Sequence, residues 1–202
     1  METRNKTVTK LAQTAIFAAL CYVAFTFLQI RIPVGEGATS LHIGNAFCVL
    51  AALLLGGPWG GMAGAIGMTI GDLLDPIYIL SAPKTFLLKL CIGLVTGLVA
   101  HRIARINESS DKSYIAKWST LAAAAGLFFN VVADPIVGYF YKTYILGQPQ
   151  EFAKALAKMS AVTTLVNAIV SVILVAVLYN AVRPALIRLQ LIQVAPAEAH
   201  NA

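Results

Sequence analysis

One stretch without Lys, Arg, Asp or Glu, from Leu41 to Gly71, strongly limits what this chain can fold into. A helix that crosses the hydrocarbon core of a membrane needs about 20 apolar residues. The stretch is therefore too long for one crossing and short for two. The sequence GGPWGG at 56–61 interrupts it, and neighbouring glycine and proline mark a turn. We predict two short helices, at about 41–55 and 60–74, joined by a tight turn.

The composition places the whole chain in a membrane. Hydrophobic types make up 58% of its 202 residues and charged types 12%, whereas soluble domains are about 45–50% apolar and about 25% charged. So few charges cannot cover a surface that faces water, which excludes a soluble globule. Disordered chains are rich in charge and poor in apolar residues, so disorder is excluded as well.

The other apolar stretches have the length of single crossings. The first, Leu11–Ile30, is longer than the apolar part of a signal peptide and lacks a following cleavage site, so we expect it to remain as a helix. The fold class predicted is an all-α integral membrane protein, a six-transmembrane-helix bundle that forms a single membrane domain over residues 1–202. Its helices are expected at about 7–30, 41–55, 60–74, 84–104, 117–141 and 155–182, with a frayed tail at 189–202.

An even number of crossings puts both termini on one side of the membrane. Lys and Arg are more numerous on that side, which includes the polar loop at 101–117, than on the other. Because cytoplasmic loops carry an excess of Lys and Arg, we expect both termini to be cytoplasmic.

Polar side chains recur in the outer halves of successive predicted helices, whereas the inner halves are almost purely apolar. A charge in the hydrocarbon costs at least about 2.5 kcal/mol and usually faces the interior of a bundle or a watery cavity. Polar groups confined to one half favour a pocket open to the outside over a pore. The residues expected to line it are His42, Asn45, Asp72, Lys84, Lys89, Asn130, Asp134, Tyr139 and Asn167.

Several of these residues also have a structural interpretation. His42 could be an interfacial histidine that is hydrogen-bonded to the backbone. Lys89 suits an anionic ligand group, but it could form a structural ion pair with Asp72 or Asp134. Asn45 could make a hydrogen bond between helices. Tyr139 could anchor the chain at the membrane boundary, where aromatic side chains are enriched.

Sequence motifs for chemistry are missing. The chain has no nucleotide-binding P-loop motif and no zinc-protease or serine-hydrolase motif. Cys21, Cys48 and Cys91 stand alone in apolar runs, without metal-ligand spacing. We expect no metal ion and no bound cofactor. A self-sufficient small transporter or channel remains an alternative to a subunit driven by other proteins, and an intramembrane enzyme is a third.

Four segments in a fixed order are similar to those of a known family: LHIGN at 41–45, LLLGGPWGG at 53–61, AIGMTIGDLL at 65–74 and PKTFLLK at 83–89. Together with an alanine face on the first helix, they resemble the S components of energy-coupling factor (ECF) transporters, in the branch related to riboflavin-type S components. The resemblance covers about residues 7–183.

The resemblance implies that the chain binds a water-soluble vitamin or a related micronutrient in an outward pocket. It implies as partners a membrane coupling protein (the T component) and two ABC ATPases, in the cell membrane of a prokaryote. Ala15 and Ala19 would meet the coupling protein, and the subunit would reorient in the membrane to release its load inside. Related sequences often carry an acidic residue where this chain has Asn45, so the vitamin itself stays open.

Overall fold

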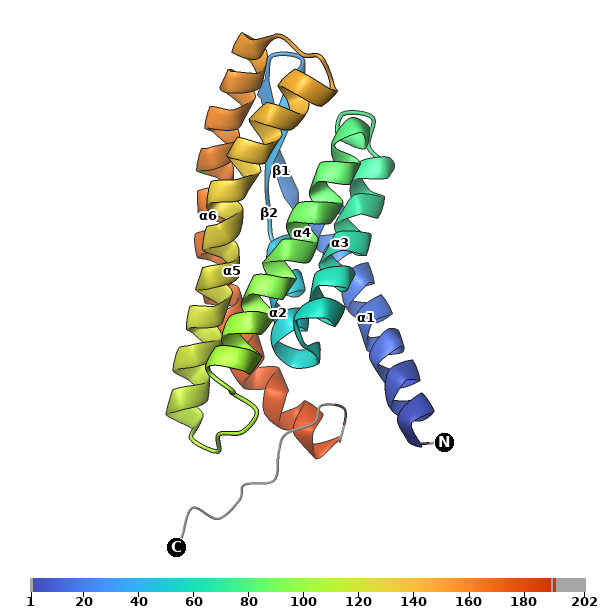
Figure 1. Ribbon diagram of the computed structural model, residues 1–202, viewed down its shortest axis with the longest axis vertical. Helices are drawn as coiled ribbons and strands as arrows, with labels where there is room; N and C mark the ends of the chain where they lie inside the picture. The colour runs from blue at the N-terminus through green and yellow to red at the C-terminus, as the bar shows by residue number, and fades with distance from the viewer. Residues whose placement is uncertain (1, 190, 192–202) are drawn as a thin grey trace, which may run out of the picture.

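The computed structural model describes residues 2–189 and 191 of the chain, and it is mostly helical (Figure 1). The elements in order are α1 (Glu2–Thr26), β1 (Gln29–Val34), β2 (Gly37–His42), α2 (Gly44–Leu55), α3 (Gly57–Leu73), η1 (Ile79–Ser81), α4 (Ala82–Gly97), η2 (Leu98–Ile103), α5 (Lys112–Phe140), η3 (Tyr141–Ile145) and α6 (Gln150–Arg188). The short elements η2 and η3 are π-helical continuations of α4 and α5.

The short helix α2 occupies the centre of the bundle. Eleven of its twelve residues are buried, and the five other α-helices all pack against it. At 1.5 Å per residue, α2 is only about 18 Å long, shorter than the ~30 Å hydrocarbon core. Strand β2 leads directly into it along the long axis of the molecule (Figure 1), so a strand followed by a short helix replaces one long helix.

The β-hairpin differs from the predicted order of helices. β1 and β2 pair antiparallel, with Gln29 opposite His42 and Val34 opposite Gly37. We expected the first helix to continue to residue 30 and the second to begin at 41. Instead, α1 ends at Thr26. Alternating β-branched residues at 30, 32 and 34 favour a strand, and Pro33 cannot continue a helix.

The other boundaries follow the prediction with shifts at the ends. The tight turn at GGPWGG shortens to Gly56, whose φ of 97° suits a glycine, and α3 begins directly after it. The last two helices begin earlier than predicted. α6 ends later, at Arg188, and α5 passes its predicted end only through its continuation η3. Apart from residues 189 and 191, the tail predicted at 189–202 lies outside the described residues.

Helices α3 and α4 touch through glycines at their crossing. A Cβ atom added to Gly93 would collide with the backbone of Gly61, and one added to Gly97 would collide with Gly57. Small residues let membrane helices approach closely. Close glycine contacts therefore pack α3 against α4.

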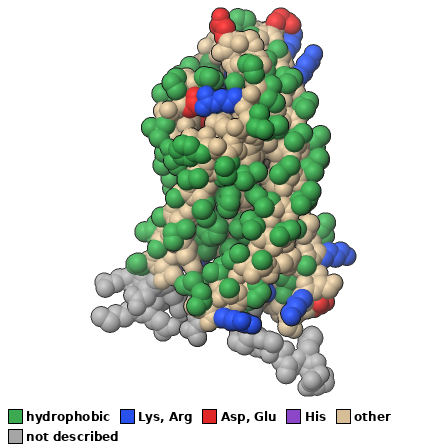
Figure 2. Space-filling view, turned by 180° about the vertical axis from the view of Figure 1, so that it is seen from behind, with side chains coloured by type: hydrophobic (Ala, Val, Ile, Leu, Met, Phe, Trp, Pro, Cys, Tyr) green, Lys and Arg blue, Asp and Glu red, His purple; other side chains and the backbone are tan. Residues whose placement is uncertain are grey.

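The surface is that of a membrane protein. Four segments are long and apolar enough to cross a membrane, namely Thr7–Thr26, Ile79–Ile103, Lys112–Ile145 and Gln150–Arg188. Figure 2 shows apolar side chains over the middle of the molecule, with most charged side chains gathered toward its two ends. The start of α1 and the end of α6 lie at the same end (Figure 1), which we call the terminal end.

Candidate functional site

A cavity of about 240 Å³ lies in the half of the molecule away from the terminal end. The β-hairpin, the loop after α3, the first half of α4, the end of α5 and the first half of α6 form its wall. It reaches from the exposed Glu36, in the hairpin turn, to buried residues deep in the bundle. Six of the nine residues expected from the sequence line it: His42, Asp72, Lys84, Lys89, Asp134 and Asn167.

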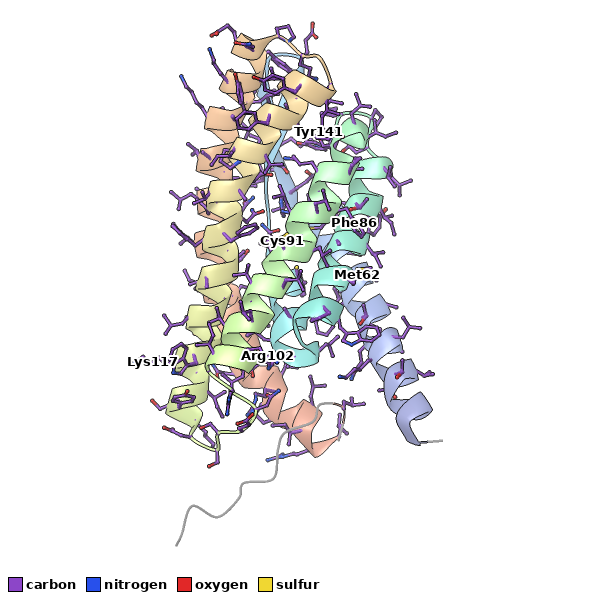
Figure 3. All side chains as sticks on the ribbon, in the orientation of Figure 1. Met62, Phe86, Cys91, Arg102, Lys117 and Tyr141 are labelled. Carbon is purple, nitrogen blue, oxygen red and sulfur yellow. The ribbon has the colours of Figure 1, made fainter. Side chains whose placement is uncertain are left out.

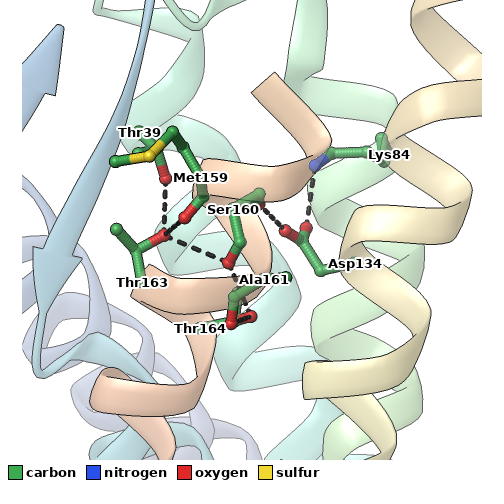
Figure 4. A network of polar contacts seen from close by, with 8 residues as sticks. All are labelled: Thr39, Lys84, Asp134, Met159, Ser160, Ala161, Thr163 and Thr164. Carbon is green, nitrogen blue, oxygen red and sulfur yellow. Dashed lines mark hydrogen bonds and ion pairs between the residues drawn. The ribbon is translucent and has the colours of Figure 1, made fainter. Parts of the chain in front are cut away.

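One side of the cavity holds an ion pair in which each carboxylate oxygen has a partner. Lys84 Nζ lies 2.8 Å from Asp134 Oδ1. The hydroxyl of Ser160 donates to the other carboxylate oxygen, Oδ2 (Figure 4). Both oxygens of Asp134 therefore have a partner, and this pair ties α4, α5 and α6 together.

Two further charges in the wall are not paired in this way. Lys89 is 6% exposed and Asp72 is 2% exposed. Within the described residues, Lys89 forms neither an ion pair nor a side-chain hydrogen bond. Asp72 Oδ2 is buried and has no hydrogen-bond partner in the same part of the chain. The expectation that Lys89 pairs with Asp72 or Asp134 is therefore not met at ion-pair distance.

Helix α6 holds strand β2 through a polar stripe. The side-chain oxygen of Asn167 accepts from the backbone N–H of His42 at 3.0 Å, and its amide donates to the carbonyl of Ser40 at 3.0 Å. Thr39 and Thr163 share a hydrogen bond between their hydroxyls at 2.7 Å (Figure 4). Asn167 thus lines the cavity while its amide fixes the strand that forms the wall.

His42 lies at the end of this strand with one ring nitrogen already used. Its Nδ1 accepts the backbone N–H of Gly44 at 3.2 Å, so Nδ1 carries no proton and Nε2 carries the ring proton. The ring packs edge-on against Phe25, with centroids 4.8 Å apart. His42 is a neutral group beside the cavity.

The loop after α3 is joined to strand β1 beside the cavity. The guanidinium of Arg31 pairs with the carboxylate of Asp75 and lies 5.8 Å from the centroid of the Tyr78 ring. Burial raises the pKa of Tyr78, so this phenol stays protonated at neutral pH. Tyr78 lines the cavity, and the Arg31–Asp75 pair holds the hairpin beside it.

Three residues expected in the pocket lie outside its lining. Asn45 and Asn130 are each 1% exposed, and the Oδ1 atom of each lacks a partner among the described residues. Tyr139 is half-buried, and its ring packs against Phe140 at a centroid distance of 5.4 Å.

Several lining residues were missed by the sequence reasoning. Ser160, Thr163 and Thr164 precede Asn167 with helical spacing on one face of α6, and that periodicity was the available signal. Lys142 also lines the cavity, because the π-helical turn η3 extends α5 past its predicted end. Apart from His42, the hairpin residues that line the cavity were not expected, because the strands were not predicted. Figure 3 shows how the side chains fill the rest of the bundle.

A family model decides the affiliation. The model described as ECF-type riboflavin transporter, S component, matches residues 5–184. The chain belongs to this family. As an S component it is a membrane transport protein, and its family is not a family of enzymes. No curated protein and no solved structure matches the chain significantly.

Proposed function

We propose that this S component captures a water-soluble vitamin or related micronutrient from outside the cell and releases it inside by reorienting in the membrane. The observation that carries the proposal is the cavity with buried, unpaired Lys89 and Asp72 at one end of the bundle. Intramembrane charges usually mark substrate sites or pathways. His42, Lys84, Asp134 and Asn167 complete the proposed binding wall.

We place the cavity on the extracellular side of a prokaryotic cell membrane. Six passages through the bundle, with β2 and α2 together as the second, put both termini at one end. That end carries the excess of basic residues, among them Arg102, Arg105 and Lys117, which favours the cytoplasm. The opposite end, with the cavity, then faces out.

The proposed partners are a T component and two ABC ATPases. The chain contains no P-loop motif, so ATP-driven uptake would need ATPase subunits supplied by other chains. Ala15 and Ala19 are exposed on α1, whereas Ala18 packs on the other side against Gly67 of α3. An exposed small-residue face on a membrane helix supports close docking of a second membrane protein, and we assign it to the T component.

Reconstitution in lipid vesicles tests this function. The chain is combined with a T component and its ATPases, and uptake of a vitamin panel that includes riboflavin is measured with and without ATP. We expect uptake of at least one member only when all subunits and ATP are present. The double variant Ala15→Leu/Ala19→Leu should abolish uptake but keep binding, because leucine side chains block close approach.

Two results would contradict the proposal. Uptake without ATP or partners would show a self-sufficient transporter. No uptake of any panel member by the complete assembly would remove the vitamin-capture role. Ile16→Leu, a volume-conserving change on the same helix, is the matched control and should leave uptake unchanged.

A further inference from the structure

The cavity wall contains two kinds of charge. Lys84 and Asp134 neutralise each other, and Ser160 satisfies the remaining carboxylate oxygen. Lys89 and Asp72 line the same cavity, are more than nine-tenths buried, and have no ion-pair partner among the described residues. The pair that is satisfied has a structural role. The Lys89 ammonium, which has no ion-pair partner, and Asp72 Oδ2, the unpartnered oxygen of a carboxylate that also contacts the Thr85 hydroxyl, remain available to a ligand.

Because Lys89 and Asp72 are buried, the lack of an ion pair at either residue indicates a place for a ligand. A buried charge without a partner is costly, so proteins normally pair it or neutralise it. Two opposite charges that face one cavity but do not form an ion pair with each other leave room for a molecule between them. Such a molecule has to present an anionic group to the ammonium and a hydrogen-bond donor or cation to the carboxylate.

Other charges at the cavity do not change this balance. Glu36 is exposed in the hairpin turn, and Lys142 is half-buried, so water reaches both. Their charges are opposite in sign, so together they favour neither an anionic nor a cationic ligand. Lys89 and Asp72 therefore set the chemistry of the deep part of the cavity.

We propose that the ligand is a compact amphoteric molecule. Its carboxylate or phosphate binds the Lys89 ammonium, and its amine or another strong donor binds the Asp72 carboxylate. The cavity of about 240 Å³ lies below the range of about 300–1,000 Å³ typical of sites for drug-sized molecules, which favours a small ligand. The inference rests on the proposed capture function and narrows its substrate class.

Matched sets of probes test the two contacts separately. The first set is pyridoxamine 5′-phosphate, with pyridoxamine lacking the anion and pyridoxine 5′-phosphate lacking the amine. The second is 4-aminobenzoate, with 4-aminobenzamide and benzoate. Riboflavin is the large probe without a permanent charge. Dissociation constants are measured by equilibrium dialysis on the purified full chain and on Lys89→Gln and Asp72→Asn.

We expect that in at least one set the amphoteric parent binds about tenfold or more tightly than either partial analogue. Lys89→Gln should remove the preference for the anion, and Asp72→Asn should remove the preference for the amine. Lys117→Gln and Glu108→Gln make the same charge changes at exposed positions of the terminal end, and both should keep the wild-type preferences.

The thermal unfolding temperature, measured without ligand, shows whether each variant is folded. Because Lys89 has no partner to lose, Lys89→Gln should unfold at the wild-type temperature or above it. A lower temperature would indicate a structural role for Lys89 and overturn its assignment.

The remaining outcomes are equally decisive. The proposal is overturned if riboflavin binds most tightly and both variants bind it like wild type, if the parents bind no better than their analogues, or if no probe binds. Tight riboflavin binding would leave the capture function standing, so the two proposals fail separately.

Discussion

The two halves of this bundle use their buried space in opposite ways. Toward the terminal end, glycines bring helix backbones into contact, as at Gly61 and Gly93, and leave no room between them. Away from it, lysine, aspartate and hydroxyl side chains surround a cavity. One half is closely packed because its helices meet at residues without side chains, and the other holds a cavity because longer, charged side chains line it. A cavity in one half of the bundle, with close helix packing in the other half, suits a protein that binds a molecule better than one that forms a continuous channel.

Two lysines of the same cavity should differ in their effect on the stability of the protein. Lys84→Gln leaves the buried carboxylate of Asp134 without its cation, and breaking a buried pair is strongly destabilising. We expect the free energy of unfolding to fall by about 3 kcal/mol. Lys89→Gln, the same change five residues later on α4, should cause no loss. The measurement is SDS-induced unfolding of the purified chain without ligand, and equal losses in the two variants would contradict the distinction.

A glycine-to-alanine substitution should have different effects on stability in the two halves of the bundle. In Gly93→Ala the new Cβ meets the backbone of Gly61, and overpacking of this kind costs about 2 kcal/mol. In Gly138→Ala, beside the cavity, the nearest atom is Lys84 Nζ at 3.6 Å, an ordinary contact. Alanine favours a helix over glycine by up to about 1 kcal/mol, so this variant should be neutral or stabilised. The same unfolding assay checks both, and a tolerated Gly93→Ala would show that the half toward the terminal end is not closely packed.

The positions of the helices were the part of the fold that could best be predicted from the sequence. Apolar runs of spanning length and the GGPWGG interruption located the six α-helices of the described residues, because a helix satisfies its backbone hydrogen bonds within one continuous segment. Asn130 and Asp134 were both expected in the pocket, and both are buried, but only Asp134 lines the cavity. Lys89 and Asp72 could be assigned to a site because charges inside a membrane are rare and usually functional.

The missed features depend on contacts between distant segments. The β-hairpin is short, and its strand β2 is held by Asn167, more than a hundred residues later in the chain. No local pattern specifies that contact. The same holds for the pairing of Asp134, which engages Lys84 of α4 and Ser160 of α6. The sequence predicted a charged pocket, but which charges are satisfied within the protein depends on its three-dimensional packing.

Sidedness of access to the cavity tests the central claim most directly. In a background with all three cysteines replaced by alanine, Ala157→Cys places a thiol at the cavity, and Lys117→Cys places one at the exposed terminal end. Right-side-out and inside-out membrane vesicles are treated with a membrane-impermeant thiol reagent. We predict that Ala157→Cys reacts only from the extracellular side and Lys117→Cys only from the cytoplasmic side. Reaction of Ala157→Cys from the cytoplasmic side, or equally from both sides, would contradict a cavity that opens only to the outside of the cell.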